Sequence, residues 1–264
     1  MTTEDSSPGY RSTRLRRPAS DAEVLPASER LSAPSERVRS GLLDLLALPV
    51  VAVMPRGGVT VLGTRVPLHY EFRRWAWRNE RCVELGLGRY AVGLRKPEDV
   101  LEVGNVLPLS GVSGHTVVDK YERGPGVINE DIVDFAPGRR YGLVVSFSTV
   151  EHVGWDEEPQ DPDKARVALR AMSDLAGESG QMLVTIPIGY HRQLEGDFVS
   201  GDAPFDDVCL LVKQSRLARW EPRPVQERTG IGYGAPYAAG NAILVGTRGN
   251  PLRSEPAQDV GVRS

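Results

Sequence analysis

Cysteine is scarce in this sequence of 264 residues, which contains only Cys82 and Cys209. Two thiols so far apart in the chain give neither a disulfide framework nor a thiolate zinc site, a pattern typical of reducing compartments. No apolar run approaches the length of a membrane span, and residues 1–20 lack the hydrophobic region of a signal peptide. We therefore expect a cytoplasmic protein without a membrane span.

An excess of basic residues is also missing. The chain has 32 Lys and Arg residues against 35 Asp and Glu residues, a formal net charge of -3. Proteins that bind nucleic acid usually carry a basic surplus, so no nucleic-acid partner is expected. At 264 residues and 40% hydrophobic content, the chain suits one α/β core with appendages better than two equal domains.

The N-terminal part of the chain is predicted to hold a tail and a small cap region. Residues 1–34 are rich in Ser, Pro, Arg and Glu and offer little to bury, so we expect a disordered tail. Residues 35–98 are predicted to form an N-terminal helix, a hairpin and a second helix. The positions that define these elements are Ser35 at the first helix start, Gly57 and Gly58 in the hairpin, and Gly86 or Gly88 at the second helix end.

Residues 99–248 are predicted to form the core, in which short segments rich in Val, Ile and Leu recur. These segments are DVLEVG, HTVVDKY, GVINEDIVDF, GLVVSFS, QMLVTIPI and NAILVGT. The expected fold class is α/β, with a Rossmann-like, seven-stranded, mostly parallel sheet. Its last strand follows a glycine-rich loop directly and should therefore run antiparallel. A helix capped by Asp161 and ended by Gly177 is predicted before the fifth strand, and residues 249–264 are expected to be a polar tail.

The loop after the first core strand is poor in glycine. A dinucleotide requires glycines at three spacings there, so that a helix N-terminus can hold the pyrophosphate. Here Gly104 is followed by Asn105, Val106, Leu107 and Pro108, and the segment before Gly114 is too short for a crossover helix. Asp119 nevertheless ends the second strand, where a carboxylate can accept ribose hydroxyls. This combination favours a nucleoside with an amino-acid tail, namely S-adenosylmethionine.

Several sequence motifs also favour S-adenosylmethionine as the ligand. They are Glu102-Val103-Gly104-Asn105, Asp119 in VDKYE, NEDIVDF after GVI, LVVSFSTVEHVGWDE, NER before the first core strand and the late YGAPY. Over about residues 70–248 the chain resembles the class I S-adenosylmethionine-dependent methyltransferases. Within that class it is similar to a bacterial subgroup associated with carbohydrate modification. The glycine loop departs from the several glycines of the class pattern.

The resemblance implies a set of cofactor contacts. Glu102 and Gly104, with Asn105 in the same loop, would line the methionine moiety, and Asp119 would hold the ribose. Asp131 would meet the adenine amino group. Ser146 and Phe147 would lie beneath the sulfonium. Each of these residues alone has a plain structural explanation, such as a solvated strand end for Glu102 or core packing for Phe147.

Methyl transfer to a hydroxyl also requires an acceptor for the proton. Histidine, with a pKa near ~6.5, is the usual base at neutral pH. His152 follows the fourth core strand, close to where the transferred methyl would lie, and is the predicted catalytic residue. The alternative is that His152 only fixes its loop by hydrogen bonds. His191, after the fifth strand, is a second candidate.

Aromatic and amide side chains around these loops are candidates for the substrate pocket. Aromatic rings can stack on the apolar face of a sugar, although such residues often serve packing instead. The candidates are Tyr70, Trp75, Trp77, Trp155, His191, Tyr233, Tyr237 and Asn241. Mg²⁺ is kept as an alternative second cofactor, held by the hard oxygen ligands of Asp119, Asp156 or Glu157.

We therefore predict an S-adenosylmethionine-dependent O-methyltransferase acting on a sugar hydroxyl. The resemblance favours a mannose- or glucose-containing oligosaccharide in polysaccharide biosynthesis as the substrate. Three alternatives stay open: methylation of a small natural product, a non-catalytic cofactor-binding protein, and an NAD-dependent oxidoreductase, which would need the missing glycine fingerprint. A homodimer is one option for the oligomeric state.

Overall fold

The computed structural model describes residues 57–71, 76–216 and 219–253. In these residues an eight-stranded sheet runs in the order β5-β4-β3-β6-β7-β10-β8-β9. The five strands from β5 to β7 are parallel, and β10 is antiparallel to both β7 and β8. The sheet strands are β3 (Val100–Val103), β4 (Thr116–Val118), β5 (Val127–Ile128), β6 (Leu143–Phe147), β7 (Gln181–Pro187), β8 (Asp207–Lys213), β9 (Trp220–Arg223) and β10 (Ala242–Arg248).

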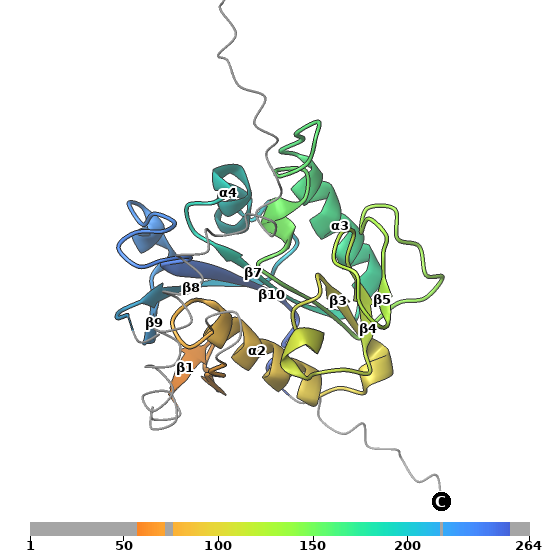
Figure 1. The fold of residues 1–264 in the computed structure, drawn as a ribbon, viewed down its shortest axis with the longest axis horizontal. Coiled ribbons are helices and arrows are strands. Elements are labelled where there is room, and N and C mark those ends of the chain that lie inside the picture. Colours follow the sequence, from red (N-terminus) through yellow and green to blue (C-terminus); the bar gives the residue numbers. More distant parts are fainter. Residues whose placement is uncertain (1–56, 72–75, 217–218, 254–264) are drawn as a thin grey trace, which may run out of the picture.

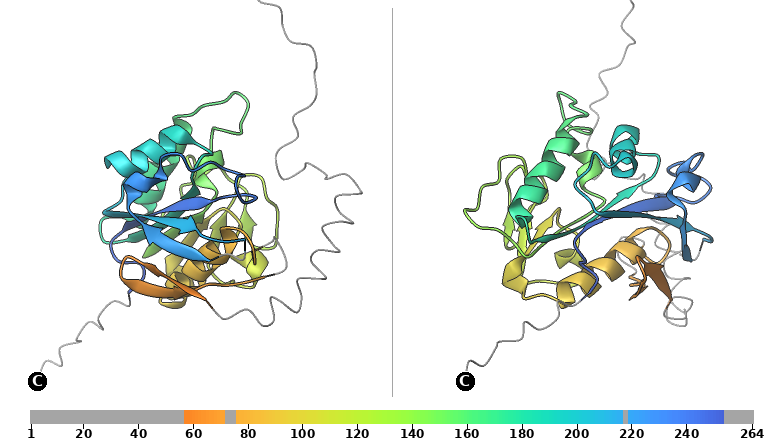
Figure 2. Two further views of the ribbon diagram at one scale, coloured as in Figure 1. Left: turned by 90° about the vertical axis from the view of Figure 1, so that its left-hand side faces the viewer. Right: turned by 180° about the vertical axis from the view of Figure 1, so that it is seen from behind.

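Helices cover both faces of this sheet, as Figure 1 shows. Helix α3 (Lys164–Ala176) and helix α4 (Arg192–Ser200) lie on one face. Helix α2 (Arg81–Gly93) lies on the other, beside the hairpin of β1 (Gly58–Val61) and β2 (Thr64–Pro67). The view from behind in Figure 2 shows the same three layers. No helix among the described residues is long and apolar enough to cross a membrane.

Alternating strand side chains build two cores, because successive residues of a strand point to opposite faces. In β6, Leu143, Val145 and Phe147 pack with α2, whereas Val144 packs with α3. Helix α3 buries Leu169 and Met172 with their neighbours on one face, as its sequence predicts, and ends at Gly177. The burial of such apolar surface supplies most of the stability of a sheet covered on both sides.

The connection between β3 and β4 contains no α-helix. A single 3-10 turn, Pro108–Ser110, stands where a parallel crossover usually has a helix. Gly111 ends this turn with φ of 80°, a left-handed conformation that suits glycine. The structure therefore confirms the expectation that this segment is too short for a crossover helix.

The structure confirms the antiparallel last strand and corrects other sequence predictions. The sheet has eight strands rather than the predicted seven: the six predicted segments form β3 to β7 and β10, and β8 and β9 lie outside them. Strand β5 holds only two residues of the predicted GVINEDIVDF segment, since Asp131 Oδ1 accepts a hydrogen bond from Val133 N and starts a turn. Helix α4 was also missed.

The predicted N-terminal elements need similar corrections. The hairpin turns at Leu62 and Gly63, where both residues have positive φ, rather than at Gly57 and Gly58. Helix α2 continues beyond Gly88 to Gly93.

Other predicted ends differ in detail or cannot be compared. Residue Asp163 occupies the N-cap of α3 in place of Asp161. The predicted tail 1–34 and the helix from Ser35 lie outside the described residues. At the other end, Leu252, within the predicted polar tail, is buried in the core.

Candidate active site

The candidate site lies at the edge of the sheet where the parallel strands end. From β3 the chain passes to β4 and β5 on one side of the sheet. It then crosses to β6 on the other side of β3, so the strand order reverses between β3 and β6. Open α/β sheets bind ligands at such a switch point, outside the carboxyl ends of the strands. Because β10 is antiparallel, the glycine-rich segment 229–241 before it also reaches this edge.

Glu102, the last-but-one residue of β3, organises the loop after that strand. Its Oε1 atom accepts hydrogen bonds from the backbone N–H groups of Val106 and Leu107, both at 2.8 Å. Its Oε2 atom lies 2.6 Å from Nε2 of His115. The Glu102 side chain is fully buried. The Glu102 carboxylate thus accepts hydrogen bonds from backbone N–H groups of the loop between β3 and β4, which contains no α-helix.

Asp119 joins the loops that follow β3 and β4. Its Oδ2 atom accepts a hydrogen bond from the backbone N–H of Asn105 at 3.1 Å. Its Oδ1 atom accepts from the N–H groups of Tyr121 and Glu122, at 2.9 and 2.7 Å. A carboxylate offers about four lone pairs. These three hydrogen bonds leave room on Oδ2 for one further donor.

Asp131 lies in a group of four charged side chains beside Asp119. Its Oδ2 atom is 2.6 Å from Lys164 Nζ and 2.9 Å from Lys120 Nζ. Glu157 Oε2 contacts the same two lysines, also at 2.6 and 2.9 Å. Burial acts to raise the pKa of Asp131, but the hydrogen bonds from Lys164 and Lys120 outweigh it and lower the pKa. This charged group ties the loops after β4, β5 and β6 together.

The structure places Ser146 and Phe147 inside the fold. The Ser146 hydroxyl donates to Val103 O at 2.9 Å, and both side chains are fully buried. The Phe147 ring faces α2: a Cβ atom added at Gly88 would lie 3.0 Å from its Cε2. As consecutive residues of β6, they point to opposite faces of the sheet, and both are enclosed by the core.

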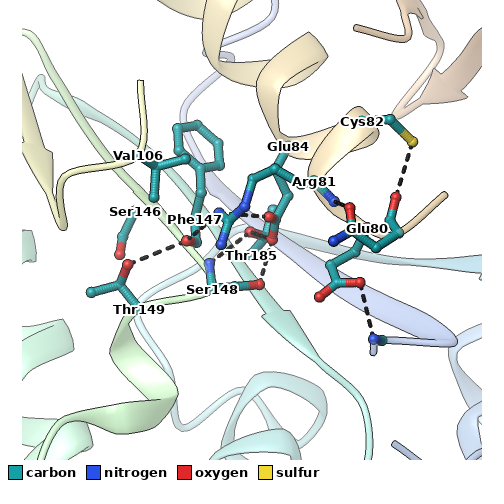
Figure 3. A network of polar contacts seen from close by, with 12 residues as sticks. Glu80, Arg81, Cys82, Glu84, Val106, Ser146, Phe147, Ser148, Thr149 and Thr185 are labelled. Carbon is teal, nitrogen blue, oxygen red and sulfur yellow. Dashed lines mark hydrogen bonds and ion pairs between the residues drawn. The ribbon is translucent and has the colours of Figure 1, made fainter. Parts of the chain in front are cut away.

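A network of buried polar side chains, drawn in Figure 3, connects α2 to the end of β6. Glu84 Oε2 lies 2.9 Å from Arg81 Nη1, and the same Nη1 donates to Phe147 O at 3.1 Å. Glu84 Oε1 accepts hydrogen bonds from Thr185 Oγ1 at 2.8 Å and from Ser148 Oγ. Sequence reasoning missed this network. Its signal was Glu84 itself, an acidic residue in the middle of the apolar stretch CVELGLG.

Two further buried carboxylates belong to this region. Glu80 Oε2 accepts a hydrogen bond from Gly240 N at 3.0 Å. Burial, followed by repulsion from Glu84, raises the pKa of Glu80 to about 7. Glu151, which follows β6, is 1% exposed, and burial raises its pKa well above the ordinary value. Perturbed carboxyl groups of this kind cluster at functional sites.

Ser148 and Thr149 carry the chain from β6 into the candidate site. Ser148 has φ of 44°, a left-handed conformation that costs free energy for a residue other than glycine. Its N–H donates to Thr185 O at 3.0 Å, which holds this conformation in place. The next residue, Thr149, packs against Gly104: a Cβ atom on residue 104 would lie 2.3 Å from Thr149 Oγ1. The loops after β3 and β6 therefore touch at the switch point.

His152 lies at the outer side of this region, with 42% of its side chain exposed. Its Nδ1 atom is 2.5 Å from Asp156 Oδ2, which also accepts a hydrogen bond from Tyr190 OH at 2.6 Å. Its Nε2 atom is 3.7 Å from Glu151 Oε1. The ring meets Tyr190 edge-on, with 4.8 Å between centroids. His152 thus stands between a buried and an exposed carboxylate.

The structure brings together some of the predicted aromatic residues. Trp155 stacks on His191 with 4.4 Å between ring centroids, and Tyr190, which sequence reasoning missed, meets Tyr233 at 5.5 Å. His191 is buried, and its Nδ1 accepts the Leu194 N–H at the start of α4. His191 therefore caps a helix.

Other predicted pocket residues serve the surrounding structure. Asn241 accepts from Tyr237 N at 2.9 Å and donates to three carbonyl groups of the segment 229–241, so its amide organises that segment. Tyr237 OH donates to Gln214 O at 3.2 Å. Tyr70 packs against the α2 core, and the Trp77 ring lies under the Arg78 guanidinium. Trp75 is outside the described residues.

The acidic residues predicted as Mg²⁺ ligands do not converge. Asp119 binds backbone N–H groups, Asp156 contacts His152 and Tyr190, and Glu157 contacts two lysines. In the described part of the chain, no group of three or more His, Cys, Asp and Glu side chains could hold a metal ion.

No family model and no curated protein matches the chain. Among solved structures, it is similar to the N-methyltransferase NodS from Bradyrhizobium japonicum WM9 in complex with S-adenosyl-L-homocysteine, with 14% identity over 64% of this chain and 85% of that chain and a TM-score of 0.41. It is also similar to a possible histamine N-methyltransferase from Thermotoga maritima, with 15% identity over 60% and 86% of the two chains and a TM-score of 0.35.

A further similar structure is an S-adenosylmethionine-dependent methyltransferase from Clostridium acetobutylicum, with 9% identity over 79% of this chain and 98% of that chain and a TM-score of 0.33. All three TM-scores lie below 0.5. These likenesses therefore carry no information about the acceptor that this chain would methylate.

Proposed function

We propose that the chain is an S-adenosylmethionine-dependent O-methyltransferase whose acceptor is a sugar hydroxyl. The observation that carries the proposal is the contact of Gly104 with Thr149 at the switch point, with Asp119 on the adjoining loop. The same edge holds both a carboxylate suited to a ribose and buried carboxylates suited to proton transfer. The substrate class we favour is a mannose- or glucose-containing oligosaccharide in polysaccharide biosynthesis.

The residues of this edge fit a nucleoside cofactor without phosphates. Asp119 Oδ2 keeps a lone pair for one ribose hydroxyl, although the sequence pattern predicted that the carboxylate would accept two. The N–H groups that could hold a phosphate are taken instead: those of Val106 and Leu107 donate to Glu102. This arrangement supports S-adenosylmethionine and disfavours a dinucleotide.

The cofactor contacts follow the loops. Gly104 and Asn105 would face the methionine moiety, with Glu102 shaping their loop from beneath. Asp131 would accept a hydrogen bond from the adenine amino group. For this, Lys120 and Lys164 would have to move away or to leave one of the Asp131 oxygens available. Ser146 and Phe147 would form the floor. When bound, S-adenosylmethionine supplies an activated methyl group on a sulfonium.

The chain must then orient an acceptor and remove its proton. Alignment supplies much of the rate of such an in-line displacement. The sequence predicts His152 as the base. Because its Nδ1 atom faces Asp156, its Nε2 atom is the nitrogen that can take up the proton, either from the acceptor or from a neighbouring carboxylate. Mixed aromatic and carboxylate surroundings suit a sugar, whose apolar face stacks on rings while its hydroxyls donate to carboxylates.

The proposal is tested by methyl transfer from labelled S-adenosylmethionine to methyl glycosides of mannose and glucose and, in parallel, to polyphenol and alkaloid aglycones. Transfer to at least one glycoside, and to no aglycone, is expected. Transfer to aglycones alone would establish the small-molecule alternative. Cofactor binding without any transfer would favour the non-catalytic alternative.

A further inference from the structure

Glu151 is a buried carboxylate to which no other described residue donates a hydrogen bond. It lies in the 3-10 turn Val150–His152 after β6, and its side chain is 1% exposed. In the part of the chain that the structure describes, no other residue gives either carboxylate oxygen a hydrogen bond, and only the backbone N–H of Glu151 itself acts on the carboxylate. An unpaired buried carboxylate destabilises a fold and therefore calls for an explanation. A ligand that donates a hydrogen bond to Glu151 would provide one.

The charged groups around Glu151 do not neutralise it. Glu84 and Glu80 repel its charge, and Arg81 attracts it. The Arg81 guanidinium is already bonded to Glu84 and to Phe147 O. Three carboxylates thus share one guanidinium.

Three other groups lie near this carboxylate cluster. Burial lowers the pKa of Lys213, the nearby charge of Glu80 acts against this, and Lys213 Nζ donates to Arg78 O. Tyr233, from the segment before β10, interacts with Glu151, and so does Tyr190, from the segment after β7. Both interactions are electrostatic, since neither described phenol donates a hydrogen bond to Glu151.

The position of Glu151 relates it to the methyl donor and to solvent. Two residues before it, Thr149 packs on Gly104 of the predicted cofactor loop. One residue after it, His152 presents Nε2 at 3.7 Å from Glu151 Oε1 and places Nδ1 against the exposed Asp156. A line of titratable groups therefore leads from the buried end of the site to its surface.

We propose that Glu151 takes the proton of the acceptor hydroxyl and that His152 then carries this proton toward solvent. The inference rests on the proposed function. The acceptor oxygen forms a bond to the methyl carbon while the carbon–sulfur bond breaks and the sulfur keeps the electron pair. The hydroxyl proton passes to a Glu151 oxygen and from there to His152 Nε2.

Burial gives Glu151 the properties of a useful base. Because burial raises its pKa well above the ordinary carboxyl value, its ionised form binds a proton more strongly than a solvated glutamate does. A sulfonium bound nearby is a positive charge, which favours the ionised form when the donor is present. Turnover should therefore rise with pH as Glu151 ionises in the complex.

The test compares Glu151→Gln with the wild-type chain in three measurements. Calorimetry with S-adenosylhomocysteine should give the same affinity for both. The melting temperature of the variant should exceed that of the wild type increasingly as pH rises, because only the wild type must bury a charge. Transfer to the glycoside panel should fall about ~10²–10⁴-fold and lose its rise with pH.

Two further variants separate the roles. Glu195→Gln changes another buried glutamate, whose Oε1 accepts from Gly189 N at 2.7 Å, and should retain its turnover. His152→Ala should lose less turnover than Glu151→Gln, and added imidazole should restore part of it. A larger loss in His152→Ala would make His152 the base and overturn the proposal.

Other outcomes are equally decisive. Glu151→Gln with turnover within threefold of the wild type would overturn the role of Glu151 while leaving the methyltransferase intact. Loss of S-adenosylhomocysteine binding in that variant alone would show a structural role. A wild-type chain that binds no S-adenosylhomocysteine, or methylates no glycoside, contradicts the proposed function itself, and the present inference falls with it.

Discussion

Gly104 and Thr149 approach so closely that a Cβ atom on residue 104 would lie 2.3 Å from Thr149 Oγ1. Gly104 also has φ of 95°, which disfavours any other residue. Gly104→Ala should therefore destabilise the chain by more than the ~1–2 kcal/mol of a left-handed alanine and weaken S-adenosylhomocysteine binding. Urea unfolding and calorimetry would measure both effects.

Gly126→Ala provides the matched control. Gly126 has φ of 79°, and a Cβ atom there would meet nothing within 4 Å. This variant should show the backbone cost alone, with unchanged cofactor affinity. Equal losses in the two variants would mean that the contact with Thr149 has no energetic consequence.

Asp119 should contribute directly to cofactor binding. Asp119→Ala removes the predicted ribose acceptor and also the bond to Asn105 N. We expect cofactor binding weaker by about ~1.5–3 kcal/mol, the value of a charge-assisted hydrogen bond. Calorimetry with S-adenosylhomocysteine measures this change, and unchanged affinity would remove Asp119 from the site.

Glu80 should make stability depend on pH. Burial, and then repulsion from Glu84, raises the pKa of Glu80 from its ordinary 4.5 to about 7. A carboxyl with a raised folded-state pKa contributes stability that is present below about pH 4.5 and lost as pH rises through about 7. Glu80→Gln should remove this loss, so its melting temperature should exceed that of the wild type at pH 8 and match it at pH 4. Identical pH profiles for the two proteins would contradict the burial of an ionised Glu80.

Glu84 should stabilise the network between α2 and β6. Glu84→Ala leaves Arg81 without its buried partner and deprives Thr185 of its hydrogen-bond acceptor. Breaking a buried pair by removing one partner costs about 3–5 kcal/mol. Equilibrium unfolding in urea measures this loss. Glu227→Ala, in an exposed 3-10 turn, should leave stability within about 0.5 kcal/mol of the wild type, and a similar small change in Glu84→Ala would show that the network contributes little.

The sequence was sufficient for the end of β4 and the direction of β10, and insufficient for the length of β5 and for the contacts made by distant residues. Asp119 was placed correctly because it directly follows an apolar strand, a local pattern with one interpretation. The antiparallel β10 was predicted because the connection before it lacks a helix. By contrast, helix α4 was not predicted because its sequence RQLEGDFVS has few apolar residues, and β8, which follows it, was missed although its sequence DVCLLVK is apolar.

The cluster of buried carboxylates is another feature that depends on contacts between distant residues. Glu80 and Glu84 precede Glu151 by some 70 residues in the chain, and only the packing of α2 against the end of β6 brings their charges together. No local pattern records that proximity. Similarly, the sequence could not show that the Asn241 side-chain amide forms hydrogen bonds within its own loop or that His191 caps α4.

Binding of the spent cofactor tests the central claim most directly. Calorimetry of the wild-type chain with S-adenosylhomocysteine, and separately with NAD⁺, requires no knowledge of the acceptor. We predict saturable binding of S-adenosylhomocysteine with one site per chain and no measurable binding of NAD⁺. Binding of NAD⁺ in its place, or no binding of S-adenosylhomocysteine, would contradict the proposed cofactor.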